Sequence, residues 1–296
     1  MVKKISIIGA GGVGSNLAFN ILNNLDIEEL VLLDIKKDHA QAVACDLEDT
    51  RGFLDFSTEI KGTKNYSEIK DSDIVVFSAG IARRQGMTRL DLLRINGEIA
   101  EAAALKVKKY APKSIVIAIT NPLDVITYLI LKKTKFSAKK VMGMGASLDT
   151  SRLLNILFKK TKIAASSQEA FVFGPHSKDM IVNFNKKKRK SSKDIAEAVK
   201  YRGARIVKLF KNKSAVFGPS LACCRLIEAI SYNKNKIIPV SVLLTGQYGI
   251  KDICLGMPCV VNRTGVAKVV EQDLPAQAKK NLKKISLSVK ETLKKL

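Results

Sequence analysis

Residues 5–14 read ISIIGAGGVG, a short apolar run that leads directly into a series of glycines. The glycines have the spacing G-x-G-x-x-G, and the residues after them place Val13, Leu17, Ile21 and Leu25 at helical intervals. In a dinucleotide-binding turn the first glycine permits the tight bend, the second lets the backbone approach a pyrophosphate, and the third lets the helix pack against the sheet. Taken alone, the pattern also fits a simple glycine turn that precedes a helix.

Asp34 favours the dinucleotide interpretation. It lies 20 residues beyond Gly14, at the end of the next predicted strand, 30–33. A carboxylate at this place accepts hydrogen bonds from both ribose hydroxyls and repels a 2′-phosphate, so NAD is favoured over NADP. The cofactor site predicted from these residues comprises Gly9, Ala10, Gly11, Gly12, Val13, Gly14 and Asp34.

Strand and helix patterns alternate through the first half of the chain. Apolar runs predict strands at 2–8, 30–33, 73–79, 114–120 and 140–144, and helical spacing predicts helices at 13–25, 40–54, 90–110 and 122–132. Continuous apolar runs are typical of parallel strands covered on both faces. The predicted fold class is therefore α/β, with a doubly wound parallel Rossmann sheet in an N-terminal, NAD-binding domain over residues 1–145.

The pattern changes near Gly145. The remaining sequence predicts helices at 149–160, 192–210, 219–232 and 275–296, short strands at 169–173 and 180–183, and a hairpin-like region at 237–270. These elements predict a C-terminal α+β domain over residues 146–296, which carries the substrate. No low-complexity linker separates the halves, so we expect them to pack closely. The last helix places its apolar residues on one face: Leu282, Ile285, Val289, Leu293 and Leu296.

The composition is that of a globular protein. Of 296 residues, 46% are hydrophobic and 26% are charged, which excludes wholesale disorder. No apolar run approaches the ~18 residues of a membrane span. Five cysteines, an odd number without a C-x-x-C pair, favour reduced thiols in the cytoplasm. The glycines at 9–14 interrupt any signal-peptide helix, so we expect an unprocessed protein.

The net charge is +24, from 51 Lys and Arg against 27 Asp and Glu. Such a charge occurs in proteins that bind nucleic acids or membrane surfaces. Lysines recur along most predicted helices, however, and aromatic residues make up only 6% of the chain. We interpret the charge as a solvated surface that attracts small anions, and nucleic acid is not the partner that we expect.

The chain has only two histidines. His39 lies in a polar stretch, where we expect a surface role. His176 lies in a turn, G-P-H-S at 174–177, between two predicted strands. It is the candidate for proton transfer near neutral pH, and a buried structural histidine is the alternative.

Several motifs in the same order resemble the lactate/malate dehydrogenase family, in particular its lactate-dehydrogenase-like malate dehydrogenases. Besides the glycine turn and Asp34, residues 79–93 (AGIARRQGMTRLDLL) resemble the mobile active-site loop of the family and the helix after it. T-N-P at 120–122, L-D-T-S-R at 148–152, G-P-H at 174–176 and T-G-Q-Y-G at 245–249 match further motifs. The resemblance covers almost the whole chain.

The resemblance implies roles for individual residues. His176 would take and return the substrate proton, and Asp149 would orient the imidazole and stabilise its charged form. Arg152, on the same helical face as Asp149, would bind the C1 carboxylate of the substrate. Arg89 would polarise the carbonyl when the loop closes. Asn121 would hydrogen-bond the reacting oxygen.

The resemblance adds Asn96, Ile119 and Asn121 to the cofactor site, and it implies a cis bond between Asn121 and Pro122. It implies no metal. The family forms dimers or tetramers partly through the helix after Asp34, so we expect a homodimer or homotetramer.

Arg83 sets the expected substrate. The resembling lactate dehydrogenases commonly have glutamine at this loop position, and the malate dehydrogenases have arginine. A charge in a closed site is complementary to a second carboxylate, which malate and oxaloacetate carry. The implied activity is NAD-dependent malate dehydrogenase, the reversible oxidation of (S)-malate to oxaloacetate.

Two alternatives remain at this point. If Arg83 faces solvent, the substrate is lactate or another 2-hydroxy acid. A more distant alternative is a catalytically inactive module that binds a dinucleotide or nucleic acid. Ser177 also departs from the family, which usually has glycine there; if the position needs a positive φ, serine costs about 1 kcal/mol.

Overall fold

The computed structural model describes residues 2–81, 87–162, 164–166, 170–184, 192–211, 213–274 and 276–294, without the side chains of Arg89 and Ser192. In the first half, strands and helices alternate: β1 (Lys4–Ile8), α1 (Gly12–Asn24), β2 (Glu29–Leu33), α2 (Lys37–Glu48), α3 (Arg51–Leu54), β3 (Glu59–Thr63), β4 (Ile74–Phe77), α4 (Arg89–Tyr110), β5 (Ile115–Ala118), α5 (Leu123–Thr134) and β6 (Val141–Gly143).

The second half mixes helices with antiparallel strands. Its elements are α6 (Gly145–Thr161), β7 (Ala170–Phe173), β8 (Ile181–Phe184), α7 (Ser192–Lys200), α8 (Arg202–Phe210), α9 (Phe217–Ser231), β9 (Lys236–Thr245), β10 (Lys251–Asn262), β11 (Gly265–Val269) and α10 (Ala276–Leu293). The described residues also form three 3-10 turns, η1 (Tyr66–Ile69), η2 (Ala138–Lys140) and η3 (Gln247–Gly249).

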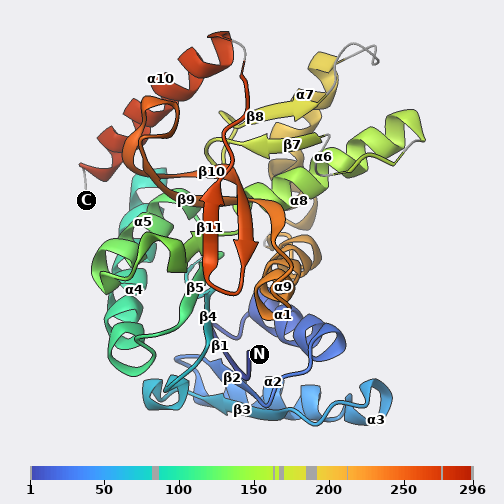
Figure 1. Ribbon diagram of the computed structural model, residues 1–296. Helices are drawn as coiled ribbons and strands as arrows, with labels where there is room; N and C mark the ends of the chain where they lie inside the picture. Colours follow the sequence, from blue (N-terminus) through green and yellow to red (C-terminus); the bar gives the residue numbers. More distant parts are fainter. Residues whose placement is uncertain are drawn as a thin grey trace.

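One nine-stranded sheet runs through both halves of the molecule (Figure 1), in the order β11-β10-β9-β6-β5-β4-β1-β2-β3. The six strands from β3 to β6 are parallel and follow the doubly wound order that the sequence predicts. Strands β9, β10 and β11 then continue the same sheet in antiparallel fashion, because Gly143 of β6 pairs with Ser241 of β9. The β7–β8 hairpin forms a separate small sheet.

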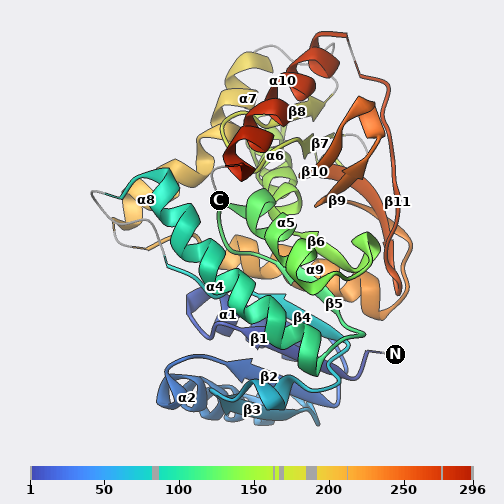
Figure 2. The ribbon, with the colours of Figure 1, turned by 90° about the vertical axis from the view of Figure 1, so that its left-hand side faces the viewer.

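Helices cover both faces of the parallel sheet, which explains its continuous apolar runs. In β4, Ile74 and Val76 belong to the core cluster that α1 and α9 cover, whereas Val75 and Phe77 belong to the cluster that α4 and α5 cover. Figure 1 shows α4 and α5 on one side of the sheet and α1 and α9 on the other. In Figure 2 the side with α4 and α5 faces the viewer, and α4 runs diagonally in front of the sheet. A doubly wound sheet needs this covering on both faces.

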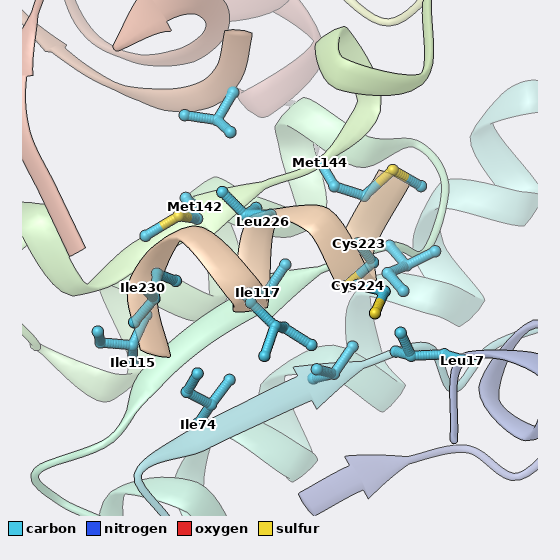
Figure 3. Packing of buried hydrophobic residues seen from close by; sticks show 14 of the residues in the cluster. Leu17, Ile74, Ile115, Ile117, Met142, Met144, Cys223, Cys224, Leu226 and Ile230 are labelled. Carbon is cyan, nitrogen blue, oxygen red and sulfur yellow. The ribbon is translucent and has the colours of Figure 1, made fainter. Parts of the chain in front are cut away.

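Helix α9 joins the second half of the chain to the first. Its buried Cys223, Leu226 and Ile230 pack against the sheet near Ile117 and Met142 (Figure 3). The Ser220 hydroxyl lies 3.0 Å from the Val13 carbonyl oxygen in the first turn of α1. These contacts give the close packing of the two halves that we expected.

Strand β3 is not predicted by the sequence pattern. Its residues, EIKGT, alternate between exposed and inward positions, because β3 is the edge strand of the sheet. An edge strand lacks the continuous apolar run that marks a central one. Gly62 lies against α2, and a Cβ at this position would lie 2.3 Å from the Ala40 carbonyl oxygen.

Two helices predicted as continuous are interrupted. The helix predicted at 40–54 is α2 and α3, which meet where the Thr50 hydroxyl donates to the Leu47 carbonyl at 2.7 Å and so competes with the helical backbone bond. The helix predicted at 192–210 is α7 and α8, which meet at Tyr201. Gly203, a weak helix former, lies two residues after Tyr201.

The final helix, α10, packs as its pattern predicts. Leu282 is fully buried, and Val289 and Leu293 lie against the main core. Leu296 lies outside the described residues. None of the helices in the described ranges combines the length and the apolarity that a membrane span needs.

The glycine turn yields a test of the fold. A Cβ at Gly14 would lie 1.9 Å from the Gly9 carbonyl oxygen, whereas a Cβ at Gly11 would have no heavy atom within 4 Å. We predict that Gly14→Ala lowers the free energy of unfolding by at least about 2 kcal/mol, because backbone must move to relieve the clash. Gly11→Ala, the matched control, changes it by less than about 1 kcal/mol. Denaturant titration measures both, and equal effects would contradict the packing role of Gly14.

Candidate active site

The glycine turn leaves the N-terminus of α1 open to a ligand. Helix α1 starts at Gly12 with Gly11 as its N-cap, and it has neither an acidic residue in its first turn nor a side chain bonded to its cap. Free N–H groups and the positive end of the helix dipole are therefore available to an anion. The open space at Gly11 is the space that a pyrophosphate close to the backbone requires. The turn thus fits the predicted dinucleotide.

Asp34 is held by the same turn. One carboxylate oxygen accepts the Ala10 N–H at 2.9 Å, and the other accepts the Lys36 N–H at 3.0 Å. These two bonds fix the carboxylate in place. Because each oxygen can accept a further hydrogen bond, the carboxylate can still accept bonds from ribose hydroxyls. His39 is exposed, as expected, but its Nε2 lies 3.0 Å from the Ala10 carbonyl oxygen, a contact that the sequence does not indicate.

Asp149, Arg152 and His176 form one connected group. The Asp149 side chain is only 1% exposed, and its two oxygens have different partners. One lies 2.6 Å from His176 Nδ1, and the other accepts from Arg152 Nη1 at 2.9 Å. Because Nδ1 faces the carboxylate, Nε2 is the ring nitrogen that remains for a substrate. Arg152 uses one of its five N–H donors here and keeps the others.

Asp149 lies inside a helix rather than at its cap. We expected the helix to begin near Asp149, but α6 begins at Gly145, separated from β6 only by its N-cap residue, Met144. Asp149 and Arg152 are therefore one turn apart on the same inward face, which brings both beside His176. A Cβ at Gly145 would lie 2.8 Å from His176 Cγ, so the imidazole packs directly on the start of α6.

A second buried carboxylate fixes the turn that carries His176. Asp124 of α5 accepts the His176 backbone N–H at 2.8 Å and the Ser241 hydroxyl at 2.6 Å. Burial raises the pKa of Asp124, and the two hydrogen bonds oppose that shift. The turn is also anchored to β10, because Gly174 and Gly256 exchange both backbone hydrogen bonds, at 2.8 and 2.9 Å.

The pKa of His176 is raised above its ordinary value. Burial of the ring favours the neutral form, but the charge of Asp149 and its hydrogen bond to Nδ1 outweigh that effect. Arg152 opposes protonation, and Asp124 assists it. The Asp149 carboxylate therefore stabilises the protonated imidazole, the form that results when the ring accepts a proton.

Asn96 connects two further parts of the predicted site. It is 1% exposed; its Oδ1 accepts the Ile81 N–H at 2.8 Å, and its Nδ2 donates to the Asn121 carbonyl at 2.7 Å. The Asn121–Pro122 bond is cis, as the resemblance implies. Ile119 is 7% exposed and belongs to the main core cluster.

Some predicted features lie outside the described residues or differ from expectation. Arg83 is not among the described residues, and for Arg89, the first residue of α4, only the backbone is described. Ser177 does not have a positive φ, so the expected strain is absent; its N–H donates to the Pro175 carbonyl at 2.8 Å. No cluster of three potential metal-ligating side chains occurs in the described part of the chain.

Asp124, Ser241 and Gly145 are not predicted as site residues by the sequence. Asp124 and Gly145 contact His176 directly, and Ser241 donates to Asp124; none belongs to a chemical motif that a single sequence reveals. A weak signal existed for Asp124, a carboxylate in an otherwise apolar helix, LDVITYLIL at 123–131. Buried carboxylates are rare unless they have partners.

Comparison with known proteins identifies relatives along the whole chain. Sequence models described as lactate/malate dehydrogenase, NAD binding domain, and as lactate/malate dehydrogenase, alpha/beta C-terminal domain, match residues 3–143 and 146–296. A malate dehydrogenase of Methanosarcina barkeri is 37% identical over 307 residues, covering 100% of this chain and 99% of the relative.

Solved structures show the same likeness. The malate dehydrogenase of Archaeoglobus fulgidus in complex with NADH superposes with a TM-score of 0.93 at 34% identity, covering 99% of each chain. The lactate dehydrogenase of Cryptosporidium parvum, complexed with lactic acid and the dinucleotide cofactor, gives 0.91 at 28% identity, covering 99% of this chain and 98% of that one.

The pairing of Asp149 with His176 can be tested by titration. We predict that Asp149→Asn lowers the pKa of His176, because burial and Arg152, both of which favour the neutral ring, then outweigh the smaller assistance from Asp124. NMR titration of the imidazole protons measures the shift, and His39→Gln assigns the two resonances. An unchanged pKa would contradict the geometry around Asp149.

Proposed function

The chain belongs to the lactate/malate dehydrogenase family, and from this membership and the geometry around His176 we propose that it is an NAD-dependent malate dehydrogenase. The proposed reaction is the reversible oxidation of (S)-malate to oxaloacetate. The observation that carries the proposal is the Asp149 carboxylate, which joins the proton-transfer group, His176, to a carboxylate-binding group, Arg152.

The proton path follows from the contacts of the imidazole. During oxidation, His176 Nε2 takes the proton of the C2 hydroxyl, and the Asp149 carboxylate on Nδ1 stabilises the resulting imidazolium. During reduction the proton returns along the same path to the oxygen of oxaloacetate. When bound, NAD supplies the acceptor for the hydride that leaves C2.

The remaining residues bind and orient the reactants. The free donors of Arg152 form a planar fork that suits the C1 carboxylate of the substrate, and Asn121 is proposed to hydrogen-bond the reacting oxygen. The glycine turn and Asp34 hold the dinucleotide, with Asn96 and Ile119 nearer the nicotinamide half. Arg89, whose backbone opens α4, is assigned the polarisation of the carbonyl.

Arg83 distinguishes the proposal from its nearest alternative. The group of Asp149, Arg152 and His176 serves a lactate dehydrogenase equally well, because lactate and malate share the 2-hydroxy carboxylate. Only malate carries a second carboxylate for the Arg83 guanidinium to neutralise. The presence of the complete group speaks against an inactive dinucleotide- or nucleic-acid-binding module.

The assembly and compartment are further parts of the proposal. Phe53, Leu209 and Phe217 are exposed by 90, 73 and 74%, and burial of such side chains against a second copy would stabilise a homodimer or homotetramer. Light scattering tests this, and the mass of a single chain would contradict it. We place the protein in the cytoplasm, a reducing compartment that suits its five free thiols, and assign it no nucleic-acid or membrane partner.

The first test removes the proposed base. We predict that His176→Asn, an approximate isostere that cannot exchange a proton near neutral pH, lowers kcat for oxaloacetate reduction at least ~100-fold. NADH binding, followed by fluorescence titration, should stay within about twofold because the glycine turn is untouched. Near-normal turnover would assign His176 a purely structural role.

The second test concerns substrate choice. We predict that Arg83→Gln lowers the ratio of kcat/KM for oxaloacetate over pyruvate by about 100-fold or more, because breaking a charge pair in a closed site costs about 3–5 kcal/mol. Pyruvate has a methyl group in place of the second carboxylate, so its kcat/KM should hold or rise. If the ratio barely changes, Arg83 does not contact the substrate and the assignment of malate fails.

A further inference from the structure

His39, the second histidine of the chain, contacts the glycine turn. It lies in the first turn of α2, where we expected it to have only a surface role. Its Nε2 lies 3.0 Å from the Ala10 carbonyl oxygen, and Ala10 itself is fully buried. Because a carbonyl oxygen can only accept a hydrogen bond, Nε2 must be a ring nitrogen that carries a hydrogen. The neutral tautomer with its hydrogen on Nε2 and the charged imidazole both satisfy this condition.

Two side chains from the connection between β2 and α2 hold the backbone of Ala10. The Ala10 N–H donates to the Asp34 carboxylate at 2.9 Å, and the Ala10 carbonyl is bonded by His39. Ala10 lies after the end of β1 and before the start of α1, so neither group takes part in a strand or a helix. The conformation of Ala10 therefore depends on Asp34 and His39.

The carbonyl groups of the turn are bonded within the protein. The Gly9 oxygen accepts the Ser78 hydroxyl at 2.8 Å. The Gly11 oxygen accepts a backbone N–H of α1 at 2.9 Å, and His39 bonds the Ala10 oxygen between them. An anion is attracted by N–H groups and repelled by carbonyl oxygens, so a turn that binds a pyrophosphate has to keep its carbonyls turned away.

The contact with His39 also determines the direction of the next N–H group. The Ala10 carbonyl and the Gly11 N–H belong to one trans peptide unit, so the two groups point in opposite directions. Gly11 is the N-cap of α1, and the space beside its Cα is open. With the carbonyl held by His39, the Gly11 N–H points away from α2. Rotation of this peptide unit would exchange the directions of the donor and the acceptor.

We propose that His39 is a positioning residue for the dinucleotide. Its Nε2 hydrogen holds the Ala10 carbonyl away from the pyrophosphate and thereby keeps the Gly11 N–H available to it. The effect falls on cofactor binding and not on the chemical step, because the contact is with the glycine turn and not with the group around His176. The inference rests on the dinucleotide site of the proposed function, and it is independent of the choice of substrate.

Three variants test this role. His39→Leu removes the donor and leaves an apolar side chain that hinders water from taking its place at the buried carbonyl. His39→Gln supplies a side-chain N–H near the position of Nε2 and so restores the donor. Gln41→Leu is the matched control: Gln41 is an exposed residue of the same helix, and its side chain makes no hydrogen bond within the described part of the chain.

Calorimetry measures binding of NADH and of ADP-ribose, which has the pyrophosphate but no nicotinamide. We expect His39→Leu to weaken binding of both ligands by a similar factor, about three- to tenfold, the factor that one hydrogen bond contributes. His39→Gln and Gln41→Leu should stay within about twofold of the unaltered protein.

Four results of this titration would overturn the proposal. Unchanged binding in His39→Leu would show that the contact does not support the turn. A loss confined to NADH would place the effect at the nicotinamide, and an equal loss in Gln41→Leu would assign it to α2 as a whole. A His39→Gln variant as weak as His39→Leu would show that the donor is not the group that matters.

Steady-state kinetics separates cofactor binding from the chemical step. With saturating oxaloacetate, KM for NADH should rise in His39→Leu by about the factor found for binding, whereas kcat should hold or rise, because weaker binding does not slow release of the product cofactor. A lower kcat with unchanged NADH binding would assign His39 to the chemical step and overturn the positioning role. If the unaltered protein does not turn over oxaloacetate, the proposed function fails, while calorimetry still decides the role of His39.

Discussion

The buried carboxylate of Asp149 is the interaction on which the arrangement of the site depends. A charge that is 1% exposed is costly unless it is paired, and Asp149 has a histidine on one oxygen and an arginine on the other. The pairing serves two purposes at once. It raises the pKa of His176 against the effect of burial, and it fixes the Arg152 guanidinium on the same carboxylate. Proton transfer and carboxylate binding are thus set by one residue.

The sheet brings these groups together. Gly143 pairs with Ser241, so the parallel and antiparallel parts share one sheet, and Ser241 donates to Asp124, which in turn holds the backbone of the His176 turn. The glycine turn and Asp34 also lie at the carboxyl ends of parallel strands, after β1 and β2. The site therefore depends on residues from both halves of the chain, at the carboxyl ends of the parallel strands where ligands bind in folds of this class.

The sequence predicts those features whose cause is local. The glycine turn, the central strands and the family itself follow from residues close together in the chain, and the fold and the relatives confirm them. Strand β3 was not predicted because an edge strand lacks a continuous apolar run. The continuation of the sheet through β9, and the support of His176 by Asp124 and Gly145, depend on contacts between distant segments, which a single sequence does not contain. The φ of Ser177 also could not be predicted from the residue type, because the surrounding turn sets it; the structure shows that it is not positive.

With NADH bound, the group of Asp149, Arg152 and His176 is proposed to support reduction of a keto acid that has two carboxylates. The most direct measurement compares initial rates of NADH oxidation by the unaltered enzyme with oxaloacetate and with pyruvate, side by side. We expect a kcat/KM for oxaloacetate that exceeds that for pyruvate by about 100-fold or more. A preference for pyruvate would make the protein a lactate dehydrogenase, and turnover of neither substrate would contradict the catalytic role of the group.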